Sequence, residues 1–208
     1  SVEERARHGF RRVLLRAPNN PMLAACWFGV IKAGAIAVGT MPMLRAKELK
    51  AIIDIGRVTH ALCDATLADE LMAVTPSLTQ WRLFNSDSGD GNQSLEAAMR
   101  RHDAPFAAVD TAADDTCLFA FTSGTTGVPK ATMHFHRDLI AACRCWPPHV
   151  LKPTPDDVFI GSPPLAFTFG LGGLLLFPMA AGASTVLLER ATPPHLLDGV
   201  RDFGATIL

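Results

Sequence analysis

Residues 122–130 combine hydroxyl groups, glycines and a lysine in a spacing that could bind phosphate. They read Thr-Ser-Gly-Thr-Thr-Gly-Val-Pro-Lys and follow an apolar stretch at 117–121 that predicts a buried strand. Glycine lets the backbone turn tightly and approach a ligand, while N–H groups, hydroxyls and one ammonium group can surround phosphate oxygens. We therefore predict a phosphate-binding loop formed by Thr122, Ser123, Gly124, Thr125, Thr126, Gly127 and Lys130.

The spacing of this loop separates it from the P-loop of kinases and GTPases. That motif has four residues between its glycines and a Ser or Thr after its lysine. Here two residues separate the glycines, and Ala131 follows Lys130. A flexible polar hairpin is the simpler interpretation of a Gly/Ser/Thr loop, but the complete nonapeptide favours a phosphate site.

The nonapeptide resembles the phosphate-binding signature of the adenylate-forming superfamily, which includes acyl- and aryl-CoA synthetases, peptide-synthetase adenylation domains and luciferases. The resemblance covers nearly the whole chain. Residues 18–44 are similar to the family's early helix-and-strand unit, and residues 161–176 to the segment that lines its acyl pocket. The sequences at 44–49 (LRAKEL) and 149–173 most resemble benzoate-CoA and 2-aminobenzoate-CoA ligases.

This resemblance implies a two-step reaction. ATP converts an aromatic carboxylate to acyl-AMP and pyrophosphate, and coenzyme A then displaces AMP. ATP, Mg²⁺ and coenzyme A are the implied cosubstrates, and a small aromatic acid is the implied partner. Short or fatty acids are the alternative substrates, and a non-catalytic binding module is the alternative to an enzyme.

The resemblance also sets the expected domain organisation. Family members are longer, and their magnesium-binding Glu, ribose-binding Asp and catalytic Lys correspond to positions beyond Leu208. We expect residues 1–208 to be a truncated part of the large N-terminal domain that binds ATP and the acyl group, with layered α/β sheets and flanking helices. We expect no metal ligands within this chain. Alone, it should be inactive and prone to self-association.

The segment Pro-Leu-Ala-Phe-Thr-Phe-Gly at 164–170 is the second candidate site. In the family, a His or an aromatic residue stands where Phe167 stands and lines the acyl pocket, and a flat ring can stack on an aryl substrate. We therefore predict substrate contacts from Phe167, Thr168 and Gly170, and a core position for Phe169. Without the resemblance, the alternation of the two rings would instead predict that both lie on one buried face of a strand.

Composition excludes some function classes. The 208 residues are 49% hydrophobic and 19% charged, and the net charge of −1 favours neither nucleic acid nor an anionic membrane. Residues 158–188 lack charge over a length that could span a bilayer, but prolines and glycines interrupt them. We expect instead a strand end, a loop, a buried helix near 171–181 and a strand at 184–188. An odd count of five cysteines and no recognisable secretory leader favour the cytoplasm.

The remaining pattern alternates between strands and helices, which predicts an α/β fold. Strands are expected at 12–16, 36–40, 60–63, 81–84, 117–121 and 130–136. Helices are expected at 21–33, 47–57, 67–74, 95–102, 138–145 and 195–203. Leu49, Ile52, Ile53 and Gly56 should share one face of the second helix. His134 and His136 should alternate on one strand face as neighbours of the nucleotide loop, without a completed metal site.

Overall fold

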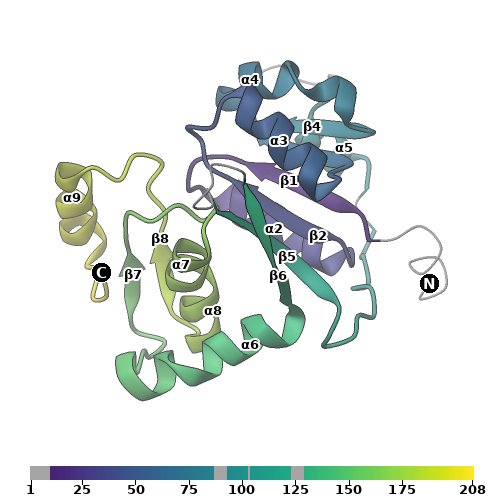
Figure 1. Ribbon diagram of the computed structural model, residues 1–208. Coiled ribbons are helices and arrows are strands. Elements are labelled where there is room, and N and C mark those ends of the chain that lie inside the picture. Colours follow the sequence, from purple (N-terminus) through teal and green to yellow (C-terminus); the bar gives the residue numbers. More distant parts are fainter. Residues whose placement is uncertain (1–9, 87–92, 103, 123–128) are drawn as a thin grey trace.

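The computed structural model describes residues 10–86, 93–102, 104–122 and 129–208. These residues form two parts that lie side by side (Figure 1). The larger part is a sheet with helices on both faces. The smaller part contains a short parallel sheet and several helices, and a long helix runs from one part to the other (Figure 1). The expected layered α/β fold is confirmed.

Six strands of the described residues form the larger sheet in the order β4-β3-β1-β2-β5-β6. Neighbouring strands are parallel except for β6, which is antiparallel to β5. The strands are β1 (Arg12–Arg16), β2 (Ile36–Thr40), β3 (His60–Asp64), β4 (Gln80–Phe84), β5 (Thr116–Thr122) and β6 (Lys130–Phe135). The central strand β1 is apolar on both faces because helices cover both faces of the sheet.

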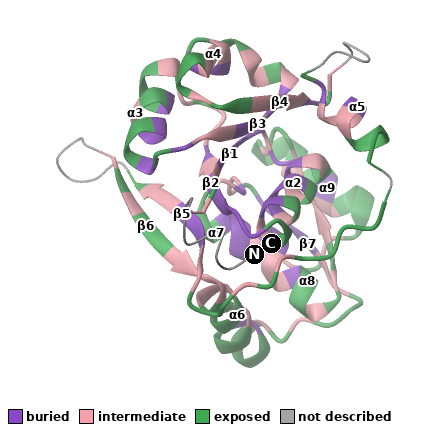
Figure 2. Cartoon of the chain, turned by 90° about the vertical axis from the view of Figure 1, so that its right-hand side faces the viewer, coloured by how far each residue is buried: buried purple, intermediate pink, exposed green. Residues whose placement is uncertain are grey.

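Helices cover both faces of the larger sheet. Helix α2 (Pro21–Lys32) packs on one face, with Asn20 as its N-cap and Pro21 in its first turn. Helix α3 (Ala46–Gly56) and α4 (Ala68–Met72) pack on the other face. The buried residues of α3 are the four predicted ones, Leu49, Ile52, Ile53 and Gly56. Figure 2 shows buried residues along the central strands and on the inner side of α3.

The chain changes direction at β1. The β1–β2 connection uses α2 on one face, whereas the connections from β2 to β3 and from β3 to β4 use α3 and α4 on the other face. The loops that follow β1 and β3 therefore separate at the carboxyl edge of the sheet. In open α/β sheets this edge, at the point where the strand order reverses, is the usual place for a ligand.

The smaller part contains β7 (Val158–Ile160) and β8 (Ser184–Val186), which are parallel. Residue Ile207 forms a parallel bridge with Phe159 on the other side of β7. A helical run joins the two strands and consists of α7 (Thr168–Leu171), η4 (Gly172–Leu176) and α8 (Phe177–Ala181). It begins earlier than the predicted helix near 171–181. The part of the chain that the structure describes has no helix with the length and apolar character needed to cross a membrane.

The ends of several elements differ from the predicted ones. Strand β6 ends at Phe135, and α6 (His136–Cys145) begins at His136. The carboxylate of Asp138 accepts a hydrogen bond from the Phe135 N–H group at 2.9 Å, so this residue stabilises the helix start from within the first turn. A π-helical turn, η3 (Pro147–Leu151), follows where no element was expected. The other helices of the described residues are α5 (Leu95–Arg100), α9 (Pro193–Phe203) and two short 3₁₀ helices, η1 (Ala65–Leu67) and η2 (Thr75–Ser77).

Candidate functional site

The two strands that flank the predicted phosphate loop pair up to its ends. Thr122 is the last residue of β5 and lies directly opposite Lys130, the first residue of β6. Both residues are exposed. Ser123, Gly124, Thr125, Thr126 and Gly127 lie outside the described residues, so their contribution stays a prediction. The two described ends, Thr122 and Lys130, lie at the carboxyl edge of the sheet, because β5 is parallel to β2.

The predicted substrate segment lies at the same edge. A Cβ atom added to Gly39 in β2 would lie 2.9 Å from the carbonyl oxygen of Ala166, so the segment contacts the strand that pairs with β5. Leu165 is buried in the core beside α2. The structure thus brings the described ends of the phosphate loop and the substrate segment to the neighbouring strands β5 and β2, although 33 residues of chain separate the two segments.

The substrate segment is a turn followed by a helix, so neither the predicted loop nor the alternative of a strand describes all of it. The Phe167 N–H group donates to the carbonyl oxygen of Pro164 at 3.0 Å, and α7 starts at the next residue. Phe169 is consequently on a helix and is 77% exposed, so its predicted core position is wrong. Phe167 is 41% exposed, Thr168 is exposed and Gly170 is buried. Partial exposure of Phe167 leaves ring surface that a substrate could cover.

Gly170 has a steric role in this turn. A Cβ atom at this position would lie 2.1 Å from the carbonyl oxygen of Pro164, closer than any real contact. Only glycine lets α7 pack back against the turn that precedes it. Gly170 therefore shapes the segment, whatever it also contributes to substrate binding.

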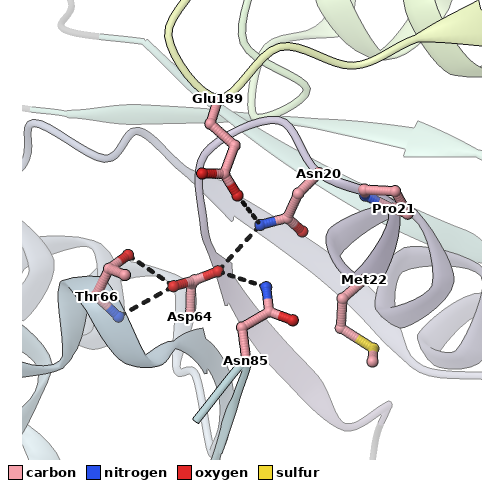
Figure 3. Close-up of a pocket in the computed structure, with 7 residues that line it drawn as sticks. All are labelled: Asn20, Pro21, Met22, Asp64, Thr66, Asn85 and Glu189. Atoms are coloured by element: carbon pink, nitrogen blue, oxygen red, sulfur yellow. Dashed lines mark hydrogen bonds between the residues drawn. The ribbon is translucent and has the colours of Figure 1, made fainter. Parts of the chain in front are cut away.

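A pocket of about 470 Å³ opens at the carboxyl ends of β1, β3 and β4, and five of its seven lining residues are polar (Figure 3). Asp64 lies at its centre and is 1% exposed. Its Oδ1 accepts hydrogen bonds from the N–H group (3.0 Å) and hydroxyl (2.6 Å) of Thr66, and its Oδ2 accepts from Asn20 (3.0 Å) and Asn85 (2.8 Å). The lining residues are Asn20, Pro21, Met22, Asp64, Thr66, Asn85 and Glu189.

The hydrogen bonds determine the charge state of Asp64. Burial alone raises the pKa of this carboxyl, but the bonds from Thr66, Asn85 and Asn20 outweigh that effect, and the net pKa is lowered. With four donors already bound, the carboxylate has no free lone pair for proton transfer to a ligand. Asn20 also donates to Glu189 at 3.2 Å, which connects the end of β3 to the segment after β8. The geometry indicates that these hydrogen bonds have a structural role and hold the two parts of the chain together.

These asparagines and Asp64 were not singled out from the sequence. Asn20 precedes Pro21 directly before a predicted helix, which is a recognisable N-cap signal. Asn20 and Asn85, which both donate to Asp64, follow different strands, β1 and β4, and are 44 and 21 residues from it along the chain. No short-range pattern could have found these two contacts.

The two histidines do not share one strand face. His134 is in β6, where its Nε2 lies 3.1 Å from the Thr132 hydroxyl, and His136 is the first residue of α6. The expected alternation on one strand is therefore wrong, because the strand ends between them. No group of three or more His, Cys, Asp or Glu residues that could hold a metal ion occurs among the described residues.

Comparison with known proteins assigns the chain to a family. Residues 6–208 match the family described as AMP-binding enzyme. The chain belongs to this family of adenylate-forming enzymes. It is 28% identical over 191 residues to a benzoate-CoA ligase of Thauera aromatica, which covers 91% of this chain and 36% of that protein. It is also 28% identical to an anthranilate-CoA ligase of Pseudomonas aeruginosa, over 95% of this chain and 38% of that protein.

A solved structure extends the family likeness to the fold. The anthranilate-CoA ligase AuaEII, crystallised with anthranoyl-AMP, matches with a TM-score of 0.89 and 26% identity. The match covers 99% of this chain and 40% of that protein. The chain thus spans less than half the length of these relatives, and its fold is that of the corresponding part of an adenylate-forming enzyme.

Proposed function

We propose that this chain is part of the N-terminal ATP- and acyl-binding domain of an AMP-forming aryl-CoA ligase. The parent enzyme activates a benzoate- or 2-aminobenzoate-type acid with ATP and transfers the acyl group to coenzyme A. The observation that carries this proposal is the nonapeptide at 122–130, whose described ends pair at the carboxyl edge of the sheet beside the substrate segment. The likeness to benzoate- and anthranilate-CoA ligases supports an aromatic acid.

The first step is an attack of the acid's carboxylate on the α-phosphorus of ATP, which forms acyl-AMP and releases pyrophosphate. In substitution at phosphorus the protein mainly positions the reactants and stabilises charge. The loop from Thr122 to Lys130 would bind the β- and γ-phosphates as they become the leaving group. Lys130 is exposed at the start of β6, so its ammonium group is free to reach a phosphate oxygen beyond the strand.

The second step is an attack of the coenzyme A thiol on the acyl carbonyl, which releases AMP. No new contact with pyrophosphate forms in this step, so the loop contributes mainly to the first step. In both steps the aromatic ring of the acid would stack on Phe167 and contact Thr168 and Gly170. A ring stacked on an aromatic side chain contributes about 0.5–1.5 kcal/mol beyond the buried area.

Magnesium is expected to accompany ATP. The described residues contain no set of three ligands for a metal ion, so we assign no step of the reaction to metal ligands in this part of the chain. The five cysteines are free, which supports a reducing compartment such as the cytoplasm.

Product analysis separates this function from its alternatives. The complete enzyme with ATP, coenzyme A and benzoate should form AMP, pyrophosphate and benzoyl-CoA in equal amounts. ADP as the nucleotide product would instead indicate a kinase-like enzyme. Faster turnover of acetate or hexanoate than of benzoate and 2-aminobenzoate would contradict the aromatic assignment, and no turnover with any acid would favour a binding module.

A further inference from the structure

Asn19 connects the first β-α unit to the substrate segment. This residue is 6% exposed and lies three residues after the end of β1. The Nδ2 group donates to the carbonyl oxygen of Pro163 at 2.9 Å, and Oδ1 accepts from the N–H group of Leu165 at 2.8 Å. We propose that Asn19 is a positioning residue for the acid pocket, acting through the backbone on both sides of Pro164. This inference rests on the proposed function, because it concerns the same pocket.

The substrate segment needs an external partner. Pro163 and Pro164 have no N–H groups, so neither can enter a helix or strand as a donor. The N–H group of Leu165 is the first donor after them, and Asn19 accepts it. One amide side chain thus binds a backbone carbonyl before Pro164 and a backbone N–H group after it. A carboxamide is suited to this arrangement because it carries a donor and an acceptor on one planar group.

Two glycines limit where the segment can lie. Gly39 lets the backbone of Ala166 approach β2, and Gly170 lets α7 approach the carbonyl oxygen of Pro164. The N–H group of Phe167 closes the turn onto the same carbonyl at 3.0 Å. Asn19 adds its hydrogen bonds to the Pro163 carbonyl and the Leu165 N–H group, so β2, α7 and Asn19 all contact this turn. The backbone that carries Phe167 therefore has little freedom to move while these contacts remain.

This arrangement ties the acid pocket to the phosphate loop. Asn19 follows β1, which pairs with β2, and β2 pairs with β5, whose end carries the loop. The distance between the acid's carboxylate and the α-phosphorus of ATP then depends on one continuous sheet. A misplacement of about 1 Å in such a site can cost roughly 100-fold in rate. Asn19 would influence acid use without touching the acid.

The neighbouring Asn20 provides a matched control. It is also buried, at 4% exposure, and its Oδ1 accepts from the N–H group of Leu23 at 2.9 Å, which caps α2. Its Nδ2 bonds to Asp64 and Glu189 and not to the substrate segment. Asn19 therefore accepts a hydrogen bond from the backbone amide of Leu165, and Asn20 from that of Leu23. Replacing either one removes buried hydrogen bonds, but only Asn19 holds the acid pocket.

The test uses the complete enzyme with Asn19→Ala, Asn19→Asp and Asn20→Ala. For Asn19→Ala we expect kcat/KM for benzoate to fall roughly 10- to 100-fold, with the KM for ATP within about twofold of wild type. The ratio of kcat/KM for benzoate to that for hexanoate should fall about 10-fold. Asn19→Asp keeps the acceptor for Leu165 and, as the neutral acid only, can still donate to the Pro163 carbonyl oxygen. Its loss relative to wild type should therefore be smaller at about pH 5 than at about pH 8, a difference that stays readable if Asn19→Ala does not fold. Asn20→Ala should lower thermal stability and leave this ratio within about twofold.

Hydrogen exchange gives a readout that does not depend on turnover. Asn19→Ala should speed exchange of the Leu165 amide and leave that of Leu23 unchanged, and Asn20→Ala should do the reverse. Equal loss of benzoate and hexanoate use in both alanine variants, or unchanged exchange at Leu165 in Asn19→Ala, would overturn the proposal. If the wild-type enzyme formed no aryl-AMP, the proposed function would fail while the exchange result still tested the connection itself.

Discussion

Thr122 and Lys130 lie directly opposite each other in the antiparallel β5–β6 pair, so the sheet joins the two ends of the nonapeptide that is predicted to bind phosphate. This relationship places a conformationally permissive, glycine-containing sequence between two fixed points. The same edge of the sheet carries the end of β2, where Gly39 contacts the substrate segment at Ala166. One sheet edge therefore presents both candidate binding segments.

The phosphate loop should act mainly in the first half-reaction. We expect Thr126→Ala or Lys130→Ala in the complete enzyme to slow adenylate formation by roughly 10²–10³-fold, because each removes a donor to developing charge on the leaving pyrophosphate. Thiolation of preformed acyl-AMP should change far less. Single-turnover measurements of each half-reaction check this.

Lys47→Ala is the control for a lost positive charge, because Lys47 is an exposed residue of α3. It should leave both half-reactions close to wild type. Equal losses in the two half-reactions of Lys130→Ala would argue against the assignment of the loop.

Phe167 should determine the preference for aromatic acids. We expect Phe167→Ala to reduce discrimination between benzoate and short aliphatic acids by about 1–3 kcal/mol and to leave the KM for ATP nearly unchanged. Phe169→Ala, which removes a ring that is 77% exposed two residues away, is the matched control. An unchanged preference for benzoate in Phe167→Ala would show that this ring lies outside the pocket.

Asp64 should stabilise the fold through its hydrogen bonds. Asp64→Asn keeps the shape but turns an NH₂ group toward N–H or O–H donors, which should destabilise the protein by about 1–3 kcal/mol. Asp69→Asn, at an exposed position on α4, should have almost no effect. Thermal unfolding of the two variants measures the difference.

The Asp64 contribution should depend on pH. The pKa of this carboxyl is lowered in the folded state, so its stabilising effect is complete above the ordinary carboxyl pKa of about 4. It is lost as the pH falls through the lower folded value. The gap in melting temperature between wild type and Asp64→Asn should therefore narrow below about pH 4. A gap that widens on acidification would contradict this sign.

A polypeptide of these 208 residues alone should not catalyse CoA ligation. Each group that stabilises the transition state must lie within hydrogen-bond reach of it, and the phosphate loop cannot replace an additional lysine or a metal site. Pyrophosphate release by the purified polypeptide, with ATP, Mg²⁺ and a panel of benzoates, checks this. Turnover near that of the complete enzyme would show that residues 1–208 already contain the catalytic groups.

Local patterns in the sequence were sufficient to predict much of the fold. The buried face of α3 follows from the spacing of Leu49, Ile52, Ile53 and Gly56, since helical periodicity is a property of neighbouring residues. The N-terminal start of α2 follows from Pro21 in its first turn. Such features need no knowledge of distant contacts.

Features that depend on distant contacts or on competing local choices were not predictable. Phe167 and Phe169 alternate like strand residues, but the Pro164 carbonyl and the small Gly170 allow a helix to start between them. Asn19 bonds to residues about 145 positions away, so its role appears only once the two parts of the chain are folded together.

The central claim is that the acid's carboxylate attacks the α-phosphorus of ATP, and the fate of carboxylate oxygen tests it most directly. Benzoate labelled with ¹⁸O in both carboxylate oxygens is incubated with the complete enzyme, ATP, Mg²⁺ and coenzyme A, and the nucleotide product is analysed by mass spectrometry. Attack on the α-phosphorus predicts one ¹⁸O atom in the phosphate of AMP and none in pyrophosphate. Label in inorganic phosphate with ADP as the nucleotide product, or no label in AMP, would contradict the account.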